Sequence, residues 1–212
     1  MRIYAVADIH GREASMKRVL ATCPIADPDV LVIAGDITGY GNEETIFQRF
    51  DNLSFPVLAV HGNVDHDNLA SVTKLYENVR SLHMREEVVT GVSFVGIGGG
   101  LSNPLIENLI HREVSIVKKA AELLNEKCVA VTHTPPWGIL DRGFASLHGG
   151  SKSLLSLVEK KQPRLLICGH IHEHRGKAQV GRTTVVNCSM GIRGAGALIE
   201  MYDGQEIRVT FL

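Results

Sequence analysis

The chain has 212 residues, a length that one domain commonly fills, so we expect a single domain over residues 1–212 with one buried core. Hydrophobic residues make up 44%, charged residues 21%, and the net charge is -1, which excludes the composition of disordered and fibrous chains. Proteins that neutralise many nucleic-acid phosphates carry a basic excess. This balance therefore disfavours a long nucleic acid as partner and leaves a small anionic substrate open.

The N-terminal segment and the cysteines indicate a cytoplasmic protein. Residues 1–8 turn polar too early for a signal-peptide apolar region or a membrane span, so no membrane association is expected. The cysteines are far apart in the sequence and form no Cys-x-x-Cys pair: Cys23, Cys128, Cys168 and Cys188. We expect reduced, mostly buried thiols rather than disulfides.

Apolar runs and helical patterns alternate along the first half of the chain, as in proteins built from α/β units. Short β-rich runs at 3–7, 30–34 and 56–60 each end at a polar or glycine-containing turn. Helical spacing of apolar side chains is found over 14–22, 43–50 and 69–76. We therefore expect strands that are covered by amphipathic helices.

The second half predicts another sheet. Residues 87–90 and 93–97, linked by Gly91-Val92, indicate a hairpin, and 105–125 form the longest helical pattern. Further strands are expected at 128–132, 164–168, 177–180, 183–187, 197–202 and 206–211, with a helix around 152–160. The chain is predicted to be an α/β protein, α+β by some schemes, with two packed β-sheets.

Polar residues follow the C-terminal ends of five predicted strands, where parallel strands of an open sheet share a crevice. In chain order they are Asp8 and His10, Asp36, Asn63, His133, and His170 with His172. Any one of them alone has an ordinary structural explanation as a helix cap, a turn residue or a hydrogen-bonded histidine. Their recurrence at five strand ends, with glycines beside three, favours a shared site.

The donor types in this set suit metal ions. In an extended segment residues two apart point to the same side, so Asp8 with His10, and His170 with His172, can face one cavity. Carboxylate, amide oxygen and imidazole together suit Mn²⁺, Fe²⁺, Zn²⁺, Co²⁺ or Ni²⁺ better than Ca²⁺. Seven donors exceed the needs of one tetrahedral ion, and if Asp36 bridges they divide into two clusters of four.

The ordered blocks resemble the calcineurin-like metallophosphoesterase superfamily over roughly the whole chain. These blocks are Asp8-x-His10, Gly35-Asp36, Gly62-Asn63, His133 and Gly169-His170-x-His172. The resemblance implies a four-layer α-β-β-α sandwich of two mixed β-sheets, with the site at the strand C-terminal ends. It also implies one metal held by Asp8, His10, Asp36 and His172, and a second held by Asp36, Asn63, His133 and His170.

Further blocks resemble a prokaryotic phosphodiesterase-like branch of this superfamily: His133-Thr134-Pro135-Pro136, His148-Gly149-Gly150-Ser151 and Ile171-His172-Glu173. On this interpretation His148 hydrogen-bonds a substrate phosphate, Gly149 permits close approach, and Ser151 caps the next helix. Asn63 is expected to contact substrate as well. The alternative for the second block is a loop histidine before an ordinary helix cap, and both interpretations stand.

We expect a hydrolase of phosphate esters, in particular phosphodiesters of small molecules, that uses two divalent ions with Mn favoured. Attack by a metal-bridging hydroxide is the expected mechanism. Many relatives carry a histidine directly after the Asn, as a proton donor, but here that residue is Val64. His66, His148 or water are the candidates for the catalytic acid.

Other functions remain open at this point. A non-catalytic protein-binding scaffold with the phosphoesterase fold would need none of the seven donors. A phosphomonoesterase, a nuclease or a protein phosphatase could use the same metal centre, although no basic stripe for nucleic acid is evident. A homo-oligomer is compatible with the exposed strands that the pattern predicts.

Overall fold

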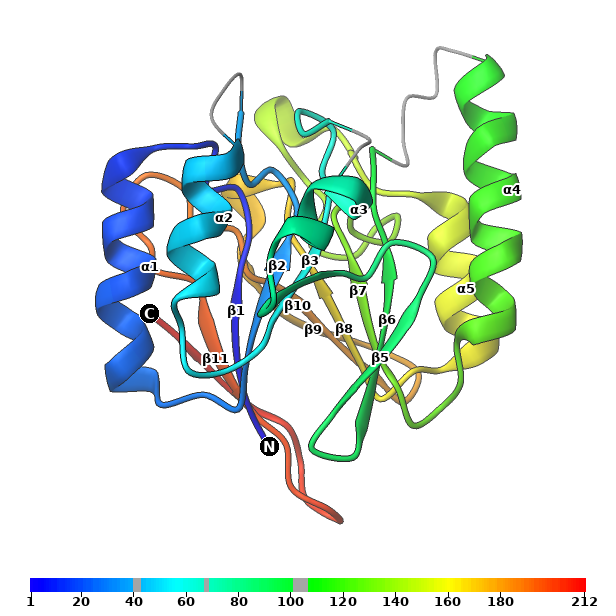
Figure 1. Ribbon diagram of the computed structural model, residues 1–212. Helices are drawn as coiled ribbons and strands as arrows, with labels where there is room; N and C mark the ends of the chain where they lie inside the picture. The colour runs from blue at the N-terminus through cyan, green and yellow to red at the C-terminus, as the bar shows by residue number, and fades with distance from the viewer. Residues whose placement is uncertain (40–42, 67–68, 101–106) are drawn as a thin grey trace.

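The computed structural model describes residues 1–39, 43–66, 69–100 and 107–212, which form two six-stranded mixed β-sheets (Figure 1). The first sheet has the order β12-β11-β1-β2-β3-β4 and the second the order β5-β6-β7-β8-β10-β9. In the first, β1 to β4 run parallel and β11 runs antiparallel to β1. In the second, β6, β7, β8 and β10 run parallel, whereas β5 and β9 are antiparallel to their neighbours.

The strands are short apolar segments. Those of the first sheet are β1 (Arg2–Val6), β2 (Val30–Ala34), β3 (Val57–Val60), β4 (Val79–Ser81), β11 (Ala197–Glu200) and β12 (Arg208–Phe211). Those of the second are β5 (Glu86–Val89), β6 (Val92–Ile97), β7 (Val129–Thr132), β8 (Leu165–Cys168), β9 (Gly176–Val180) and β10 (Thr183–Asn187). The central strands of both sheets are buried at every position, which is why they appear as continuous apolar runs rather than alternating ones.

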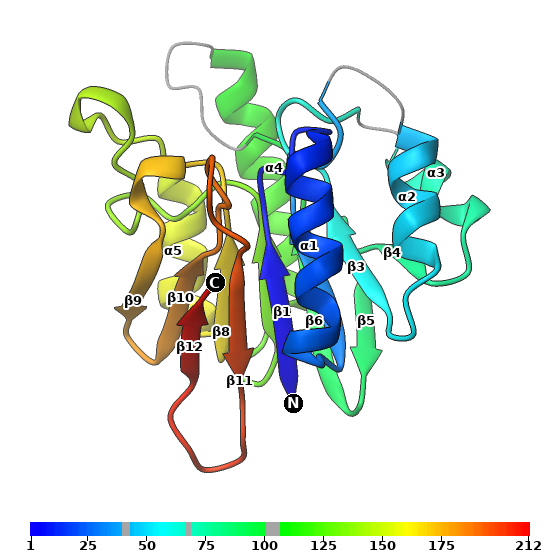
Figure 2. The same ribbon diagram turned by 90° about the vertical axis from the view of Figure 1, so that its left-hand side faces the viewer.

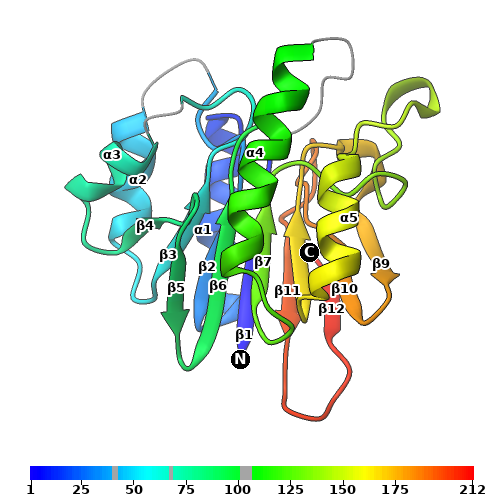
Figure 3. The same cartoon turned by 90° about the vertical axis from the view of Figure 1, so that its right-hand side faces the viewer.

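Helices cover the outer face of each sheet. Figure 2 shows α1 (Glu13–Ala26) and α2 (Glu43–Asp51) on the first sheet, beside the short α3 (Leu69–Val72) and its 3₁₀ continuation Thr73–Leu75. Figure 3 shows α4 (Glu107–Leu123) and α5 (Lys152–Lys161) on the second. Two further 3₁₀ turns, Phe144–Ser146 and His172–His174, lie in loops. The four-layer α-β-β-α sandwich expected from the sequence is therefore confirmed.

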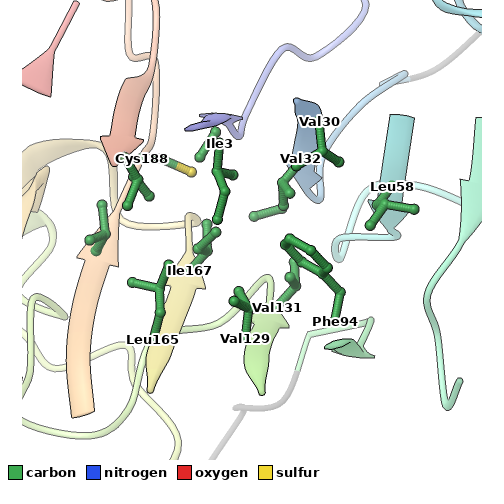
Figure 4. Packing of buried hydrophobic residues seen from close by; sticks show 14 of the residues in the cluster. Ile3, Val30, Val32, Leu58, Phe94, Val129, Val131, Leu165, Ile167 and Cys188 are labelled. Atoms are coloured by element: carbon green, nitrogen blue, oxygen red, sulfur yellow. The ribbon is translucent and has the colours of Figure 1, made fainter. Parts of the chain in front are cut away.

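The inner faces of the two sheets meet in a continuous apolar core (Figure 4). Val32 and Leu58 from the first sheet, and Phe94, Val131 and Ile167 from the second, are fully buried in it. Full burial of such a side chain stabilises the fold by about 1.5–3 kcal/mol. All four cysteines are free and buried, as predicted.

One strand was missed, and several predicted boundaries of helices and turns were wrong. Strand β4 was not predicted, because it is only three residues long and has the exposed Arg80 at its centre. Helix α1 continues past Pro24 to Ala26, and Asp27 closes it in a left-handed conformation with its N–H bonded to the Cys23 carbonyl at 3.0 Å. The hairpin turn lies one residue earlier than predicted.

The residues of that turn are Thr90 and Gly91, with φ values of 46° and 80°. Two positive φ angles define a type I′ turn, which matches the twist of the flanking strands β5 and β6. Val92 is consequently the first residue of β6 and not part of the link.

Both sheets present the carboxyl ends of their parallel strands at the same end of the molecule. A parallel bridge between Ala7 and Ser189 joins the sheets there, and the Met190 N–H donates to the Ala7 carbonyl at 3.1 Å. The loops that follow β1, β2, β3, β7 and β8 therefore meet across the gap between the sheets. Among the described helices, none is long and apolar enough to cross a membrane.

Candidate metal centre

A first cluster of ligand atoms forms where the loops after β1 and β8 meet. One atom each from Asp8, His10 and His172 lies within 4.8 Å of the others. The His172 Nε2 is 3.3 Å from Asp8 Oδ1 and 3.4 Å from His10 Nε2. Asp8 is fully buried, whereas the two histidines are partly exposed. A carboxylate at the base of an accessible pair of imidazoles is thus available to an ion.

A second cluster forms beside the first from the loops after β3, β7 and β8. The His133 Nε2 lies 2.9 Å from Asn63 Oδ1 and 3.2 Å from His170 Nδ1. His133 is fully buried and Asn63 is exposed, so the cluster opens toward solvent on the Asn63 side.

Asp36 stands between the two clusters. Its Oδ2 is 3.9 Å from His10 Nε2 and 3.4 Å from His133 Nε2. Its Oδ1 accepts a hydrogen bond from the Val64 backbone N–H at 3.1 Å, which leaves Oδ2 to face both clusters. All seven residues predicted as metal ligands are therefore brought together, with one carboxylate oxygen in both groups.

Most of the spacings between ligand atoms fit metal coordination. Two ligand atoms that each lie about 2.0–2.1 Å from one tetrahedral ion are separated by about 3.3–3.4 Å. The separations of 3.3 and 3.4 Å in the first cluster, and 3.2 and 3.4 Å in the second, are close to this value. The separation between Asn63 Oδ1 and His133 Nε2 is shorter, at 2.9 Å, and that between Asp36 Oδ2 and His10 Nε2 is longer, at 3.9 Å. The donor set of carboxylate, amide oxygen and imidazole also suits a divalent transition metal.

Four of the seven residues have a backbone conformation that non-glycine residues rarely adopt. The φ angles are 63° at Asp8, 54° at His10, 51° at Asp36 and 71° at His170. Such left-handed positions cost about 1–3 kcal/mol each and concentrate at functional sites. Backbone hydrogen bonds hold them, including Asp8 N–H to the Gly35 carbonyl at 3.0 Å and His10 N–H to the Asp36 carbonyl at 2.8 Å.

Glycines beside the ligands allow the loops to approach closely, as predicted. A Cβ on Gly35 would lie 2.5 Å from His133 Nδ1, and one on Gly62 would lie 2.0 Å from Asp36 Oδ1. A Cβ on Gly169 would lie 2.9 Å from Asp8 Oδ2 and 2.4 Å from the Ala7 Cβ. Side chains at these positions would displace the ligands.

Hydrogen bonds behind the ligands fix their orientation. The His133 Nδ1 donates to the Ala34 carbonyl at 2.9 Å, so its Nε2 faces the cluster. The Asp8 Oδ2 accepts from the Ser189 hydroxyl, and from the His170 backbone N–H at 3.1 Å. Ser189 was not identified from the sequence, because a lone serine after β10 carries no signal of this role. Such supporting partners tune metal affinity.

Asp65 is a second supporting residue that the sequence interpretation missed. Its carboxylate accepts from the backbone N–H groups of Ile37, Thr38 and Gly62 and from the Thr38 hydroxyl, at 2.8–3.0 Å. It therefore ties the loop that carries Asp36 to the loop that carries Asn63. The motif Asn63-Val64-Asp65 was the available signal, but an aspartate in a polar turn usually has only local partners.

Comparison with known proteins identifies the family. A family model for calcineurin-like phosphoesterases matches residues 1–174. The chain belongs to the calcineurin-like phosphoesterase family. An uncharacterized protein of Methanocaldococcus jannaschii is 30% identical over 201 residues, which cover 89% of this chain and 88% of the relative. Together with the Asp/His clusters, the family supports a metal-dependent phosphoesterase.

Solved structures share the fold at low identity. An archaeal phosphodiesterase superimposes with a TM-score of 0.60 at 16% identity and is covered completely, as is this chain. GAP50, described as the anchor in the inner membrane complex of Plasmodium, superimposes with a TM-score of 0.65 at 14% identity, covering 100% of this chain and 84% of GAP50. Calcineurin-like folds therefore occur both in an enzyme and in a protein described as an anchor.

The two histidines of the second cluster differ in their electrostatic environment. Burial and the neighbouring His133 lower the pKa of His170 to about 4, which keeps it neutral and ready to bind an ion at pH 7. Burial also opposes the charged form of His133, but its hydrogen bond with Asp36 and the charge of Asp8 raise the pKa of His133 to about 9. Despite its burial, Asp36 has its pKa lowered to about 2 by His133.

Metal affinity is expected to rise with pH up to about pH 9. Below the pKa of about 9, a proton competes with the ion for His133, so affinity should fall by about tenfold per pH unit. His172, whose pKa is raised mainly by its hydrogen bond with Asp8, adds to this dependence in the same direction. Calorimetric titration with Mn²⁺ at pH 7 and pH 8 measures the effect. Equal affinities at both values would contradict it, and a His133→Asn variant should show a weaker dependence.

The remaining predicted residues lie outside these clusters. The His66 side chain is exposed, and its role as catalytic acid stays a prediction. His148 Nδ1 donates to Asp141 Oδ1 at 2.8 Å, and the Gly149 N–H donates to the Asp141 carbonyl at 2.8 Å. Ser151 caps α5 as expected, because its hydroxyl accepts from the Leu154 N–H at 2.9 Å.

Proposed function

We propose that this protein is a dinuclear metal-dependent phosphodiesterase that acts on small molecules. The observation that carries the proposal is the position of Asp36 Oδ2, 3.9 Å from His10 Nε2 and 3.4 Å from His133 Nε2. One oxygen within reach of both clusters is what a pair of ions with a shared carboxylate requires. A single-ion site would leave three or four well-placed ligand atoms without a role.

The seven ligands would divide between two ions as the resemblance to the calcineurin-like superfamily implies. Asp8, His10, Asp36 and His172 would hold one ion, and Asp36, Asn63, His133 and His170 the other, with Mn²⁺ favoured among ions that accept this mixture of donors. When bound, a pair of divalent ions supplies charge neutralisation for phosphoryl oxygens and lowers the pKa of water to about 7.

With both ions bound, the site would attract an anionic substrate. Two divalent ions bring four positive charges, and Asp8 with Asp36 returns two negative ones, so the loaded site has a charge of about +2 that attracts an anionic phosphoryl group. Asn63 is exposed at the open side of the second cluster, where it would contact the bound ester. His133 and Asp8 are buried and would act only through the ions.

The preference for diesters rests on two supports. The blocks around His133, His148 and His172 resemble a prokaryotic phosphodiesterase-like branch, and the archaeal neighbour of the same fold is described as a phosphodiesterase. A phosphomonoesterase with the same metal centre is the closest alternative, because the ligand geometry serves both ester classes.

The second candidate function is a non-catalytic scaffold, favoured by the structural neighbour described as an anchor. Against it stand the strained left-handed backbones at four ligands and the glycines that a Cβ would push into ligand atoms. A surface that only recruits a partner has no need of these costly features.

A substrate panel tests the proposal. Purified protein with added Mn²⁺ is assayed on aryl diester, aryl monoester, cyclic nucleotides and short oligonucleotides, with a folded His133→Ala variant as control. We expect hydrolysis of the diester above the monoester, and its loss in the variant. If the wild type hydrolyses no substrate faster than the His133→Ala variant under several metals, catalysis is overturned and the scaffold is favoured. If the wild type hydrolyses the monoester faster than the diester, the diester preference is overturned.

A further inference from the structure

A buried aspartate holds His148 in one orientation. Asp141 is fully buried, and its Oδ1 accepts from His148 Nδ1 at 2.8 Å. Its Oδ2 accepts from the backbone N–H groups of Gly138 at 2.9 Å and Gly150 at 3.2 Å. Because the two ring nitrogens lie on opposite sides of an imidazole, the His148 Nε2 points away from the buried carboxylate. The His148 side chain is 30% exposed.

The ring of His148 is also held from its face. It stacks on Trp137 with 4.8 Å between ring centroids and an interplanar angle of 29°. The backbone N–H of Trp137 donates to the Ser151 carbonyl at 3.0 Å, and the Lys152 ammonium lies 4.7 Å from the centroid of the Trp137 ring. A solvated loop histidine without a further role would not need contacts that hold both one ring nitrogen and one ring face.

The loop that carries His148 packs on the segment that carries His170 and His172. The Arg142 N–H donates to His174 Nδ1 at 3.1 Å, and the Asn187 side chain donates to the Ile171 carbonyl at 2.9 Å and the Leu140 carbonyl at 3.3 Å. Trp137 lies four residues after His133 in the loop after β7. The His148 unit is therefore built onto two of the loops that supply the metal ligands.

The metal centre described above has no proton donor at the position next to Asn63, where Val64 cannot ionise. The hydrolysis of an ester of a weakly acidic alcohol needs a proton on the departing oxygen. His66, two residues further along, is exposed. His148 is partly exposed, and its Nδ1 is bonded to the buried carboxylate of Asp141.

We propose that His148 is the acid that protonates the leaving oxygen in this reaction, and that Asp141 is the residue that positions it. The inference rests on the proposed phosphoesterase function. As the bond between phosphorus and the leaving oxygen breaks, its electron pair stays on that oxygen and takes the proton from His148 Nε2. The ring becomes neutral, keeps the proton on Nδ1 in its bond to Asp141, and is reprotonated by water after the alcohol departs.

Asp141→Asn is the informative variant for the positioning role. Gly138 and Gly150 present only N–H donors, so the amide oxygen of asparagine should keep facing them. The amide NH₂ then faces His148 Nδ1, which must accept, and the ring proton moves to Nε2. A neutral ring in this tautomer cannot give up its proton without becoming an anion, so acid catalysis is lost while the loop keeps its backbone hydrogen bonds.

Two diesters that differ only in the leaving group separate acid catalysis from a structural role. Methyl p-nitrophenyl phosphate has a leaving group that departs without a proton, whereas methyl phenyl phosphate benefits from one. We expect His148→Ala and Asp141→Asn to lower kcat on the phenyl ester by about 100-fold or more and on the p-nitrophenyl ester by less than about tenfold. His148→Gln, which keeps an N–H donor but no transferable proton, should restore KM and not kcat.

Control variants distinguish a failure of the acid role of His148 from a failure of the proposed phosphoesterase function. Phe144→Ala changes an 88% exposed residue of the same loop and should retain both rates. Equal losses on the two esters would overturn the acid role of His148 and leave the phosphoesterase function intact. Wild-type rates no higher than those of Asp36→Ala would overturn the phosphoesterase function and the inference with it.

Imidazole ¹⁵N spectra add a readout independent of activity. Wild-type His148 should carry its proton on Nδ1 and the Asp141→Asn variant on Nε2, and an Nε2 proton alone in the neutral wild-type ring would contradict the proposal.

Discussion

Asp36→Ala is expected to lower kcat/KM for an aryl phosphodiester by about 1,000-fold or more. The carboxylate lies in both ligand clusters, and its removal leaves Asn63, His133 and His170 without a negative ligand. Metal ions contribute several kcal/mol of transition-state stabilisation, and about 4 kcal/mol corresponds to a factor of about 1,000 in rate. The first cluster keeps the Asp8 carboxylate, so metal content should fall toward one ion per chain rather than to zero.

Asp203→Ala is the matched control for this variant, because it removes a carboxylate that is fully exposed. Steady-state kinetics and elemental analysis of the purified proteins measure both effects. A folded Asp36→Ala protein that keeps wild-type activity and metal content would remove the main support for a shared carboxylate.

Asp65→Ala is expected to damage stability and activity together. Three backbone N–H groups and the Thr38 hydroxyl lose their acceptor, which should lower the free energy of unfolding by about 2–4 kcal/mol. The same bonds connect Ile37, next to Asp36, with Gly62, next to Asn63. Metal affinity should therefore fall by about 10–100-fold, as for other groups that orient ligands.

Urea denaturation of the metal-free protein and metal titration separate the two effects. Asp65→Asn retains one acceptor oxygen and should show a smaller loss of both quantities. A variant that unfolds at a lower urea concentration but binds metal as tightly as the wild type would show that Asp65 supports the fold alone and not the site.

The site could be predicted in large part because its ligands follow buried strands. Asp8 and Asp36 each come two residues after a buried, largely apolar strand, and parallel strands bring such ends together. Left-handed backbone at these positions could not be predicted, because aspartate and histidine adopt it only where surrounding hydrogen bonds impose it.

The supporting residues were less predictable for a related reason. Ser189 contacts Asp8 across 181 positions of the sequence, and the bond between Asp141 and His148 depends on a loop without regular structure. Composition and periodicity carry no information on such pairings. Strand β4 was not predicted because it has only three residues, one of them charged, and lies at the edge of its sheet, where it pairs with one neighbouring strand.

Anomalous scattering from crystals soaked in Mn²⁺ tests the metal centre most directly. Two peaks are expected on either side of Asp36 Oδ2, one among Asp8, His10 and His172 and the other among Asn63, His133 and His170. A single peak, or peaks remote from Asp36, would contradict a pair of ions with a shared carboxylate.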